Sequence, residues 1–179
     1  MRIPNYICLH HSAVSHAKNK DQFKANNRYH MSKWFFKSSL GYFLGYNYEI
    51  SSKGKIYHAR ADGETTAACP QGNMNDGRAV HICLDGNFNT EKPTDKQIYA
   101  LRDLLRKLVT TYKIERNNIV YHKDFGNTAC PGSYMDGEKD FVRDLVLWSS
   151  KPPKQPLPNN KELILDLLKK ITNLIKEKL

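Results

Sequence analysis

The amino-acid sequence predicts an α/β fold in which helices pack on the faces of a mixed central β-sheet. Short apolar runs typical of buried strands alternate along the chain with longer segments whose apolar residues recur at helical spacing. This alternation lacks a strict strand–helix–strand rhythm, which favours a mixed sheet over an all-parallel one. With 179 residues, of which 40% are hydrophobic, the chain can bury one core and carry a small appendage.

The first half of the chain predicts a strand, a helix and a hairpin. The apolar run YICLHH (6–11) is typical of a buried strand, and it ends in two histidines. A helix is expected over residues 21–37, and four side chains at helical spacing form its inner face: Phe23, His30, Met31 and Trp34. Residues 45–51 and 55–60 show strand-like alternation and are joined by Ser-Lys-Gly, which predicts a β-hairpin.

The second half adds two strands and two helices. The strands are expected at residues 79–86 and 118–122. Thr94 and Gln97 form a capping-box pair at the start of a long amphipathic helix between these strands. The apolar stripe of this helix consists of Ile98, Leu101, Leu105, Leu108 and Tyr112. A later helix is expected to carry Phe141, Leu145 and Trp148.

A proline-rich segment, KPPKQPLPNN, divides the chain. It keeps no apolar period, so we expect a domain over residues 1–150, a semi-rigid linker over 151–160 and a C-terminal amphipathic helix over 161–179. The apolar residues of that helix fall on one stripe, which must find a surface in water. Three surfaces are available: the chain's own domain, a lipid face of the cell envelope, or a second copy of the chain in a homo-oligomer.

The composition restricts the partners and the compartment. A formal net charge of +10 predicts attraction to an anionic partner such as nucleic acid, anionic lipid or a wall polymer. The basic residues are scattered and are not interleaved with aromatic residues along one element, which argues against nucleic acid. The four cysteines form no CxxC pair, the N-terminus lacks a secretory signal, and no apolar run is long enough to span a membrane. We therefore expect a chain that is made in the cytoplasm with free thiols.

Two histidines and a cysteine lie at predicted strand ends and turns. Cys130 lies in a turn rich in glycine, asparagine and proline, which is typical of a presented side chain. Together with His122 and either His10 or His11, it offers the imidazole and thiolate ligands that zinc takes in catalytic sites with one open position. The alternative is structural, with a core histidine, a surface histidine and a small buried cysteine. Spacing alone does not decide between the two.

Four motifs, in this order, resemble one enzyme family: LHHSA (9–13), GYNYEI (45–50), ICLDGNF (82–88) and HKDFGNTACPG (122–132). Over roughly residues 1–148 the chain is similar to the zinc-dependent N-acetylmuramoyl-L-alanine amidases of the phage-lysin and peptidoglycan-recognition-protein type. The resemblance implies the fold of that family and a zinc ion held by His10, His122 and Cys130. It also implies that Tyr46 faces the metal.

Tyr46 and Thr128 are the expected catalytic side chains. The Tyr46 phenol can donate a hydrogen bond to the oxyanion of a tetrahedral intermediate or orient the attacking water, although it could instead be a packing aromatic. Thr128 occupies a position where relatives carry lysine or threonine, and it can hydrogen-bond but adds no positive charge. Some distant relatives place a catalytic glutamate where this chain has Cys83, which leaves the general base open. Asp85 and Glu49 are nearby carboxylates, and a solvated or loop-bonded role is expected for each.

The remaining histidines and cysteines are expected to support the structure. Strand alternation points His11 away from His10, which favours a structural or ligand-supporting role over ligation. His81 has no motif support. Cys8, Cys69 and Cys83 lie in or beside strands and are interpreted as packing residues.

The resemblance implies a peptidoglycan hydrolase, with zinc as cofactor and peptidoglycan as partner. It would cleave the amide bond between N-acetylmuramic acid and the L-alanine of the stem peptide. A lytic activity without a secretory signal suggests a phage endolysin, stored in the cytoplasm and released onto the cell wall. The alternatives are an intracellular amidase that recycles muropeptides and a non-catalytic peptidoglycan-binding module. Retention of all three implied ligands together with Tyr46 argues against the binding module.

Overall fold

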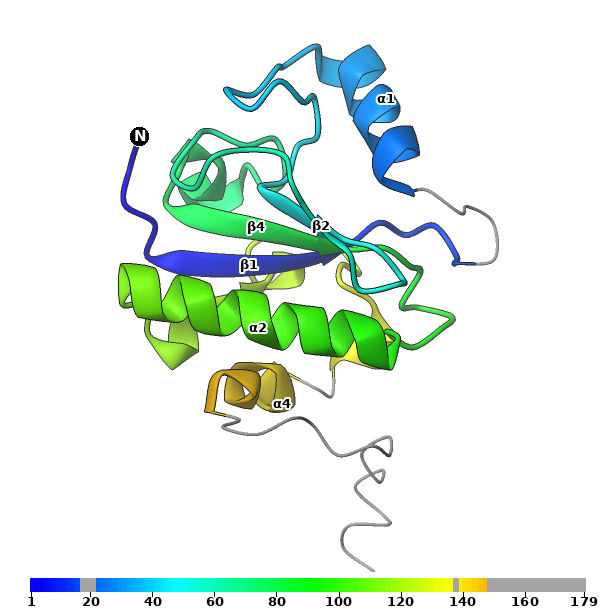
Figure 1. Cartoon of the computed structure of the whole chain (residues 1–179), viewed down its shortest axis with the longest axis vertical. Coiled ribbons are helices and arrows are strands. Elements are labelled where there is room, and N and C mark those ends of the chain that lie inside the picture. Colours follow the sequence, from blue (N-terminus) through cyan, green and yellow to red (C-terminus); the bar gives the residue numbers. More distant parts are fainter. Residues whose placement is uncertain (17–21, 137–138, 148–179) are drawn as a thin grey trace, which may run out of the picture. The chain divides into compact units, whose positions relative to one another are not determined.

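The computed structural model describes residues 1–16, 22–136 and 139–147, all within one compact unit, Met1–Trp148 (Figure 1). The expected linker (151–160) and C-terminal helix (161–179) lie outside the described residues, as does Trp148. Within the described part of the chain, no helix is long and apolar enough to cross a membrane.

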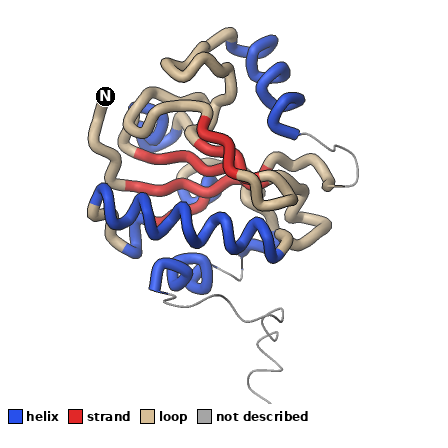
Figure 2. Tube along the Cα trace, in the orientation of Figure 1, coloured by secondary structure: helices blue, strands red, loops and turns tan. Residues whose placement is uncertain are grey.

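A five-stranded sheet forms the centre of the fold, with its strands in the order β3–β2–β4–β1–β5. Figure 2 shows the strands of this sheet in red, between the helices. The strands are β1 (Tyr6–His11), β2 (Tyr48–Ile50), β3 (Ile56–His58), β4 (Ala79–Leu84) and β5 (Ile119–Tyr121). β1 pairs in parallel with β4 and β5, and β4 also pairs in parallel with β2. The β2–β3 hairpin is antiparallel and reverses the chain at one edge. The sheet is therefore mixed, as the sequence predicts.

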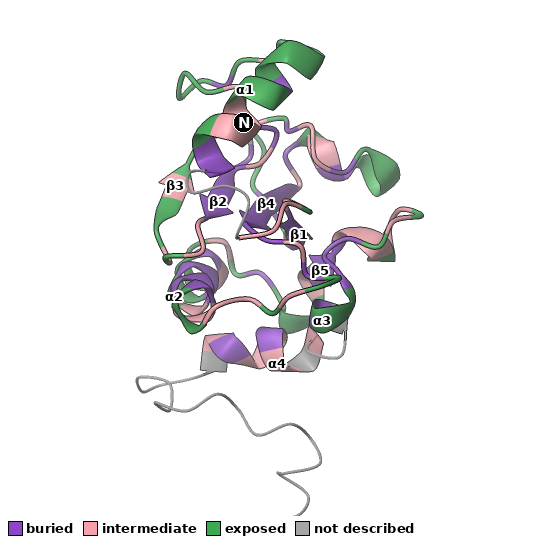
Figure 3. Cartoon of the chain, turned by 90° about the vertical axis from the view of Figure 1, so that its right-hand side faces the viewer, coloured by how far each residue is buried: buried purple, intermediate pink, exposed green. Residues whose placement is uncertain are grey.

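Helices cover both faces of this sheet. α1 (Gln22–Trp34) lies on one side, and α2 (Asp95–Tyr112) packs on the other (Figures 1 and 3). The expected third helix is divided between α4 (Lys139–Asp144) and a 3₁₀ turn, η4 (Leu145–Leu147), which pack beside α2. The other short segments are η1 (Gln71–Asp76), η2 (Arg116–Asn118), η3 (His122–Asp124) and α3 (Ser133–Asp136).

The two faces of the central strands carry different chemistry. Toward α2 the side chains are apolar and join the main core: Ile7, Leu9, Val80, Ile82 and Leu84. The alternating positions point to the opposite face and carry thiols, imidazoles and a carboxylate: Cys8, His10, Glu49, His81 and Cys83. All of these residues are buried (Figure 3). Buried polar groups are costly unless they are paired, so this second face is where a functional site is expected.

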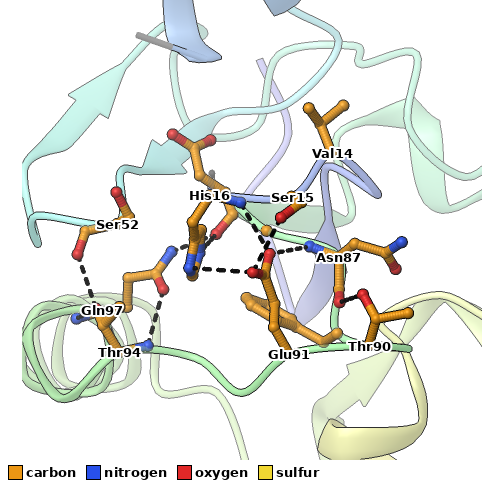
Figure 4. A network of polar contacts seen from close by, with 12 residues as sticks. Val14, Ser15, His16, Ser52, Asn87, Thr90, Glu91, Thr94 and Gln97 are labelled. Carbon is orange, nitrogen blue, oxygen red and sulfur yellow. Dashed lines mark hydrogen bonds and ion pairs between the residues drawn. The ribbon is translucent and has the colours of Figure 1, made fainter. Parts of the chain in front are cut away.

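The capping box at the start of α2 is present, as the sequence predicts. The Gln97 backbone N–H donates to Thr94 Oγ1 (3.2 Å), and the Thr94 N–H donates to Gln97 Oε1 (3.0 Å). The Gln97 side-chain amide also donates to the carbonyl oxygens of Ile50 (3.1 Å) and Asp85 (2.7 Å). The first turn of α2 thereby ties together the ends of β2 and β4 (Figure 4).

Glu91 holds the loops that follow β1 and β4. Its carboxylate accepts hydrogen bonds from the backbone N–H groups of His16 (2.9 Å) and Asn87 (2.9 Å) and from the Ser15 hydroxyl (3.2 Å) (Figure 4). These loops leave the carboxyl ends of parallel strands, which is also the end of β1 where His10 lies. The network therefore braces the rim next to that histidine.

The inner face of α1 differs from the prediction. Phe23 and His30 are buried, whereas Met31 and Trp34 are 37% and 42% exposed. Successive helical residues are about 100° apart, so Met31 turns away when its neighbour His30 faces the sheet. Trp34 lies one turn beyond His30 and packs on that ring from outside, with ring centroids 4.6 Å apart.

Candidate metal centre

The strand register places three predicted site positions in one row. His10 on β1 is paired with Cys83 on β4, and Cys83 is paired with Glu49 on β2. On the other side of β1 the pairing ends at Leu9 with Tyr121, so the next residues, His10 and His122, are neighbours. His122 opens the η3 turn that follows β5. Neighbouring strand ends therefore bring the two predicted histidine ligands together.

Cys130 completes a group of three candidate ligands. Its Sγ lies 3.7 Å from His10 Nδ1, and the rings of His10 and His122 are 4.8 Å apart at their centroids. The ligand atoms of His10, His122 and Cys130 all lie within 4.8 Å of one another. In tetrahedral zinc sites, bonds of about 2.0–2.3 Å put nitrogen and sulfur ligands roughly 3.6 Å apart. The residues and their spacing therefore fit zinc.

The loop that carries Cys130 is fixed by backbone contacts. The His11 N–H donates to Cys130 Sγ (3.4 Å), and the Lys123 N–H donates to the Cys130 carbonyl (3.0 Å). Gly132 has φ +106°, and a side chain there would meet the Phe88 carbonyl carbon at 2.5 Å. Only glycine therefore allows the loop to approach the chain after β4 this closely.

Burial sets the protonation of the three groups. Burial lowers the pKa of His10 well below 6.5 and also lowers the pKa of His122, so both imidazoles are neutral near pH 7. Burial raises the pKa of the Cys130 thiol to about 12, although the bond from His11 N–H opposes this. A metal cation would reverse the preference of the thiol, because thiolate is the form that binds metal.

Tyr46 lies beside the ring of His10, and that it faces a metal stays a prediction from the resemblance. Its ring centroid is 5.1 Å from that of His10. Burial, followed by the influence of Cys83, raises the pKa of the Tyr46 phenol well above its usual value. The phenol therefore stays protonated over the accessible pH range and can act as a hydrogen-bond donor.

Thr128 has a local contact within the ligand loop. Its hydroxyl oxygen accepts a hydrogen bond from the backbone N–H of Cys130 (3.2 Å). This bond shapes the turn that presents the cysteine. A contact of Thr128 with substrate stays a prediction.

The two carboxylates considered for proton transfer occupy different places. Glu49 is fully buried in the row with Cys83 and His10, and its Oε2 accepts from Asn26 Nδ2 of α1 at 3.0 Å. Asp85 is also buried but lies one residue beyond β4. Their burial excludes the solvated alternative for both carboxylates, and the loop-bonded alternative stays a prediction.

The other two histidines near the site also have defined contacts. His11 points away from His10, and its Nδ1 accepts from the Phe88 N–H at 3.1 Å. His81, which has no motif support in the sequence, is in contact with the ligand His10: its Nδ1 lies 2.9 Å from His10 Nε2. The available signal was alternation, because residues 81 and 83 share a face of β4.

A second group of three ligand-type residues, Cys8, His10 and His81, also lies within 4.8 Å. All three side chains are buried inside the sheet layer. This group shares His10 with the first one, and within it His10 Nε2 contacts His81 Nδ1 at 2.9 Å. The first group includes the half-buried His122, so it is the one that a substrate can approach.

Comparison with known proteins agrees with the fold and the motifs. Residues 1–133 match the N-acetylmuramoyl-L-alanine amidase family. The chain is 33% identical over 140 residues to peptidoglycan-recognition protein SC2 of Drosophila simulans, covering 75% of this chain and 71% of that protein. Among solved structures it is similar to the N-acetylmuramoyl-L-alanine amidase LysC from Clostridium intestinale, with 30% identity, a TM-score of 0.64, and 81% and 85% of the two chains covered. A second structure from that organism, the endolysin amidase LysCS, shows 29% identity, a TM-score of 0.60, and coverage of 78% and 84%.

Proposed function

Because this chain belongs to the N-acetylmuramoyl-L-alanine amidase family, we propose that it hydrolyses the amide bond between N-acetylmuramic acid and the L-alanine of the peptidoglycan stem peptide. The observation that carries the proposal is the convergence of His10, His122 and Cys130 with Tyr46 beside them. Two neutral imidazoles and one thiolate would form a zinc site of the catalytic type, in which three ligands come from the protein and one position is left open.

The three candidate ligands would hold zinc at the His10 end of the row formed by His10, Cys83 and Glu49, next to the half-buried His122. Zinc bound there supplies Lewis-acid polarisation of the scissile carbonyl and acidifies a water molecule. His10 and His122 contribute nitrogen lone pairs because their burial keeps them neutral near pH 7. Cys130 would contribute a thiolate, and the His11 N–H, which already donates to its Sγ, would stabilise the negative charge on the sulfur.

Tyr46 stabilises the oxygen that gains negative charge when water attacks the carbonyl. Its phenol is neutral and half-buried, and it lies next to the His10 ring. A fixed donor of this kind is stronger in a partly dehydrated site than in water. Thr128, on the loop that carries Cys130, would add an uncharged hydroxyl. The oxygen of the attacking water bonds to the carbonyl carbon, the C–N bond breaks, and a proton from that water passes to the departing L-alanine amine.

Relatives named recognition proteins motivate a second candidate, a module that binds peptidoglycan without cleaving it. A binding module does not need a thiol and two imidazoles brought within metal-binding distance. The complete set of ligand types with Tyr46 therefore favours catalysis. An amidase that recycles muropeptides inside a bacterium would use the same site.

The likeness to an endolysin amidase supports the proposal that the chain acts on the cell wall as a phage endolysin, after storage in the cytoplasm. The test is a turbidity assay on purified walls with and without a chelator, followed by product analysis. New free amino groups of L-alanine that disappear with chelator are expected. New reducing sugar ends would show that the chain is a glycosidase and not an amidase. Binding to the walls without any product would favour the recognition module.

A further inference from the structure

A chain of two hydrogen bonds runs from the candidate ligand His10 to the backbone of η1. His10 Nε2 lies 2.9 Å from His81 Nδ1, and His81 Nε2 lies 3.0 Å from the carbonyl oxygen of Met74. All three residues are at most 1% exposed. His10 Nδ1, at the other end, lies 3.7 Å from Cys130 Sγ. We propose that His81 is a positioning residue that fixes His10 with its proton on Nε2 and its Nδ1 lone pair directed at the metal.

The proton positions follow from the partner at the end of the chain. A carbonyl oxygen only accepts, so His81 Nε2 must carry the hydrogen that Met74 receives. A neutral His81 then has a lone pair on Nδ1, and His10 Nε2 must donate to it. His10 Nδ1 is left without hydrogen, which is the form of imidazole that binds metal. If His81 Nδ1 instead donated to His10 Nε2, His81 would carry a proton on both ring nitrogens. It would then be an unpaired cation on a fully buried face of the sheet, which is costly.

Two contacts hold His81 itself in place. It lies on the central strand β4, and its backbone N–H donates to Asn47 Oδ1 at 2.8 Å. Its acceptor, Met74, is buried in η1, the turn whose Gly72 has φ +62°. A side chain at Gly72 would meet the Phe125 ring at 2.9 Å. Phe125 follows η3, so η1 packs against the loop that carries His122 and Cys130.

This role differs from ligation by His81. In the buried group with Cys8, a metal would have to displace the hydrogen bond between His10 and His81. In the proposed arrangement His81 never touches the metal and acts through His10. Contacts of this kind orient ligating imidazoles, and their loss typically lowers metal affinity about 10- to 100-fold.

The inference rests on the proposed zinc site, and two substitutions of His81 test it. Glutamine can accept a hydrogen bond through its amide oxygen and donate one through its NH2 group, so it can replace both contacts of neutral His81, whereas leucine can replace neither. We expect His81→Leu to weaken zinc binding about 10- to 100-fold in competition with a chromophoric chelator, and His81→Gln to stay closer to the wild type. Ile82→Ala, on the apolar face of the same strand, is the control for general destabilisation. Equal zinc affinity in His81→Leu and wild type would overturn the inference, as would an equal loss in Ile82→Ala.

A second measurement does not depend on the variants folding. Long-range ¹H–¹⁵N NMR of the zinc-free wild-type protein distinguishes the two imidazole tautomers. We expect both His10 and His81 to carry their hydrogen on Nε2. A hydrogen on His10 Nδ1 would overturn the proposed role of His81. A wild-type protein that binds no zinc would remove the proposed function, while the tautomers would still decide the role of His81.

Discussion

His10 Nδ1 and Cys130 Sγ lie 3.7 Å apart although 120 residues separate them in the chain. The first is placed by a central strand and the second by a loop that approaches closely only because Gly132 lacks a side chain. The candidate metal centre is therefore a product of the whole sheet and cannot form from a local segment. The roles of its side chains and the packing that brings them together can be tested separately.

Cys130→Ser should abolish zinc binding and wall lysis. A serine hydroxyl does not ionise near neutral pH and is a weak, hard ligand in place of a strong, soft one. Zinc content by mass spectrometry under native conditions and turbidity clearing measure the two effects. Cys69→Ser is the matched control, because Cys69 is also buried but belongs to neither candidate group. A Cys130→Ser protein with full zinc content would show that Cys130 is not a ligand.

Tyr46→Phe should keep zinc and lose roughly 10²-fold or more in turnover, which is the scale of removing one oxyanion donor. The ring remains, so its packing beside His10 is preserved. Turnover on a soluble muropeptide and zinc affinity are measured on the same preparation. Unchanged turnover would assign Tyr46 to packing alone.

Zinc affinity should rise with pH between pH 6 and 8, by about tenfold per pH unit. In the zinc-free protein the pKa of Cys130 is about 12, so the thiol is protonated and zinc must displace its proton. Burial lowers the pKa values of both imidazoles below 6.5, so the thiol is expected to be the main source of the released proton. Calorimetry in buffers of different ionisation enthalpy should report one proton released. A pH-independent affinity with no proton release would contradict a thiol ligand.

Gly132→Ala should destabilise the fold and the ligand loop more than Gly41→Ala does. Both glycines have positive φ, +106° and +89°, so both substitutions carry the cost of a left-handed conformation, about 1–2 kcal/mol. Only at position 132 would the new side chain also overlap backbone, at 2.5 Å from Phe88. Chemical denaturation gives the difference in unfolding free energy. Equal losses would mean that the close approach at Gly132 does not matter.

Truncation after Trp148 should leave zinc binding and cleavage of small soluble muropeptides intact while weakening lysis of whole walls. The family match ends at residue 133, and the described residues belong to the unit Met1–Trp148. A tail that only targets the enzyme or increases its avidity affects large substrates selectively. Loss of soluble activity in a folded, truncated protein would make residues 149–179 part of the catalytic unit.

The sequence predicted what local patterns and motifs encode. β1 and the capping box of α2 follow from apolar runs and from Thr94 with Gln97. The meeting of His10, His122 and Cys130 was implied by the family resemblance and not by their spacing. The role of His81 could not be read from the sequence, because it depends on β1 and β4 lying side by side and on a carbonyl oxygen in η1. The predicted inner face of α1 was partly wrong, because Met31 is turned about 100° away from the buried His30 and Trp34 packs on the His30 ring while 42% exposed.

The most direct test of a zinc amidase centred on these ligands uses a soluble muropeptide of defined structure and protein stripped of metal. Zinc is titrated back, and the products are identified by their masses in mass spectrometry. The expected result is no cleavage without metal, activity that saturates at one zinc per chain, and two products separated at the bond between N-acetylmuramic acid and L-alanine. Full activity in the metal-free protein, or cleavage at any other bond, would contradict the account.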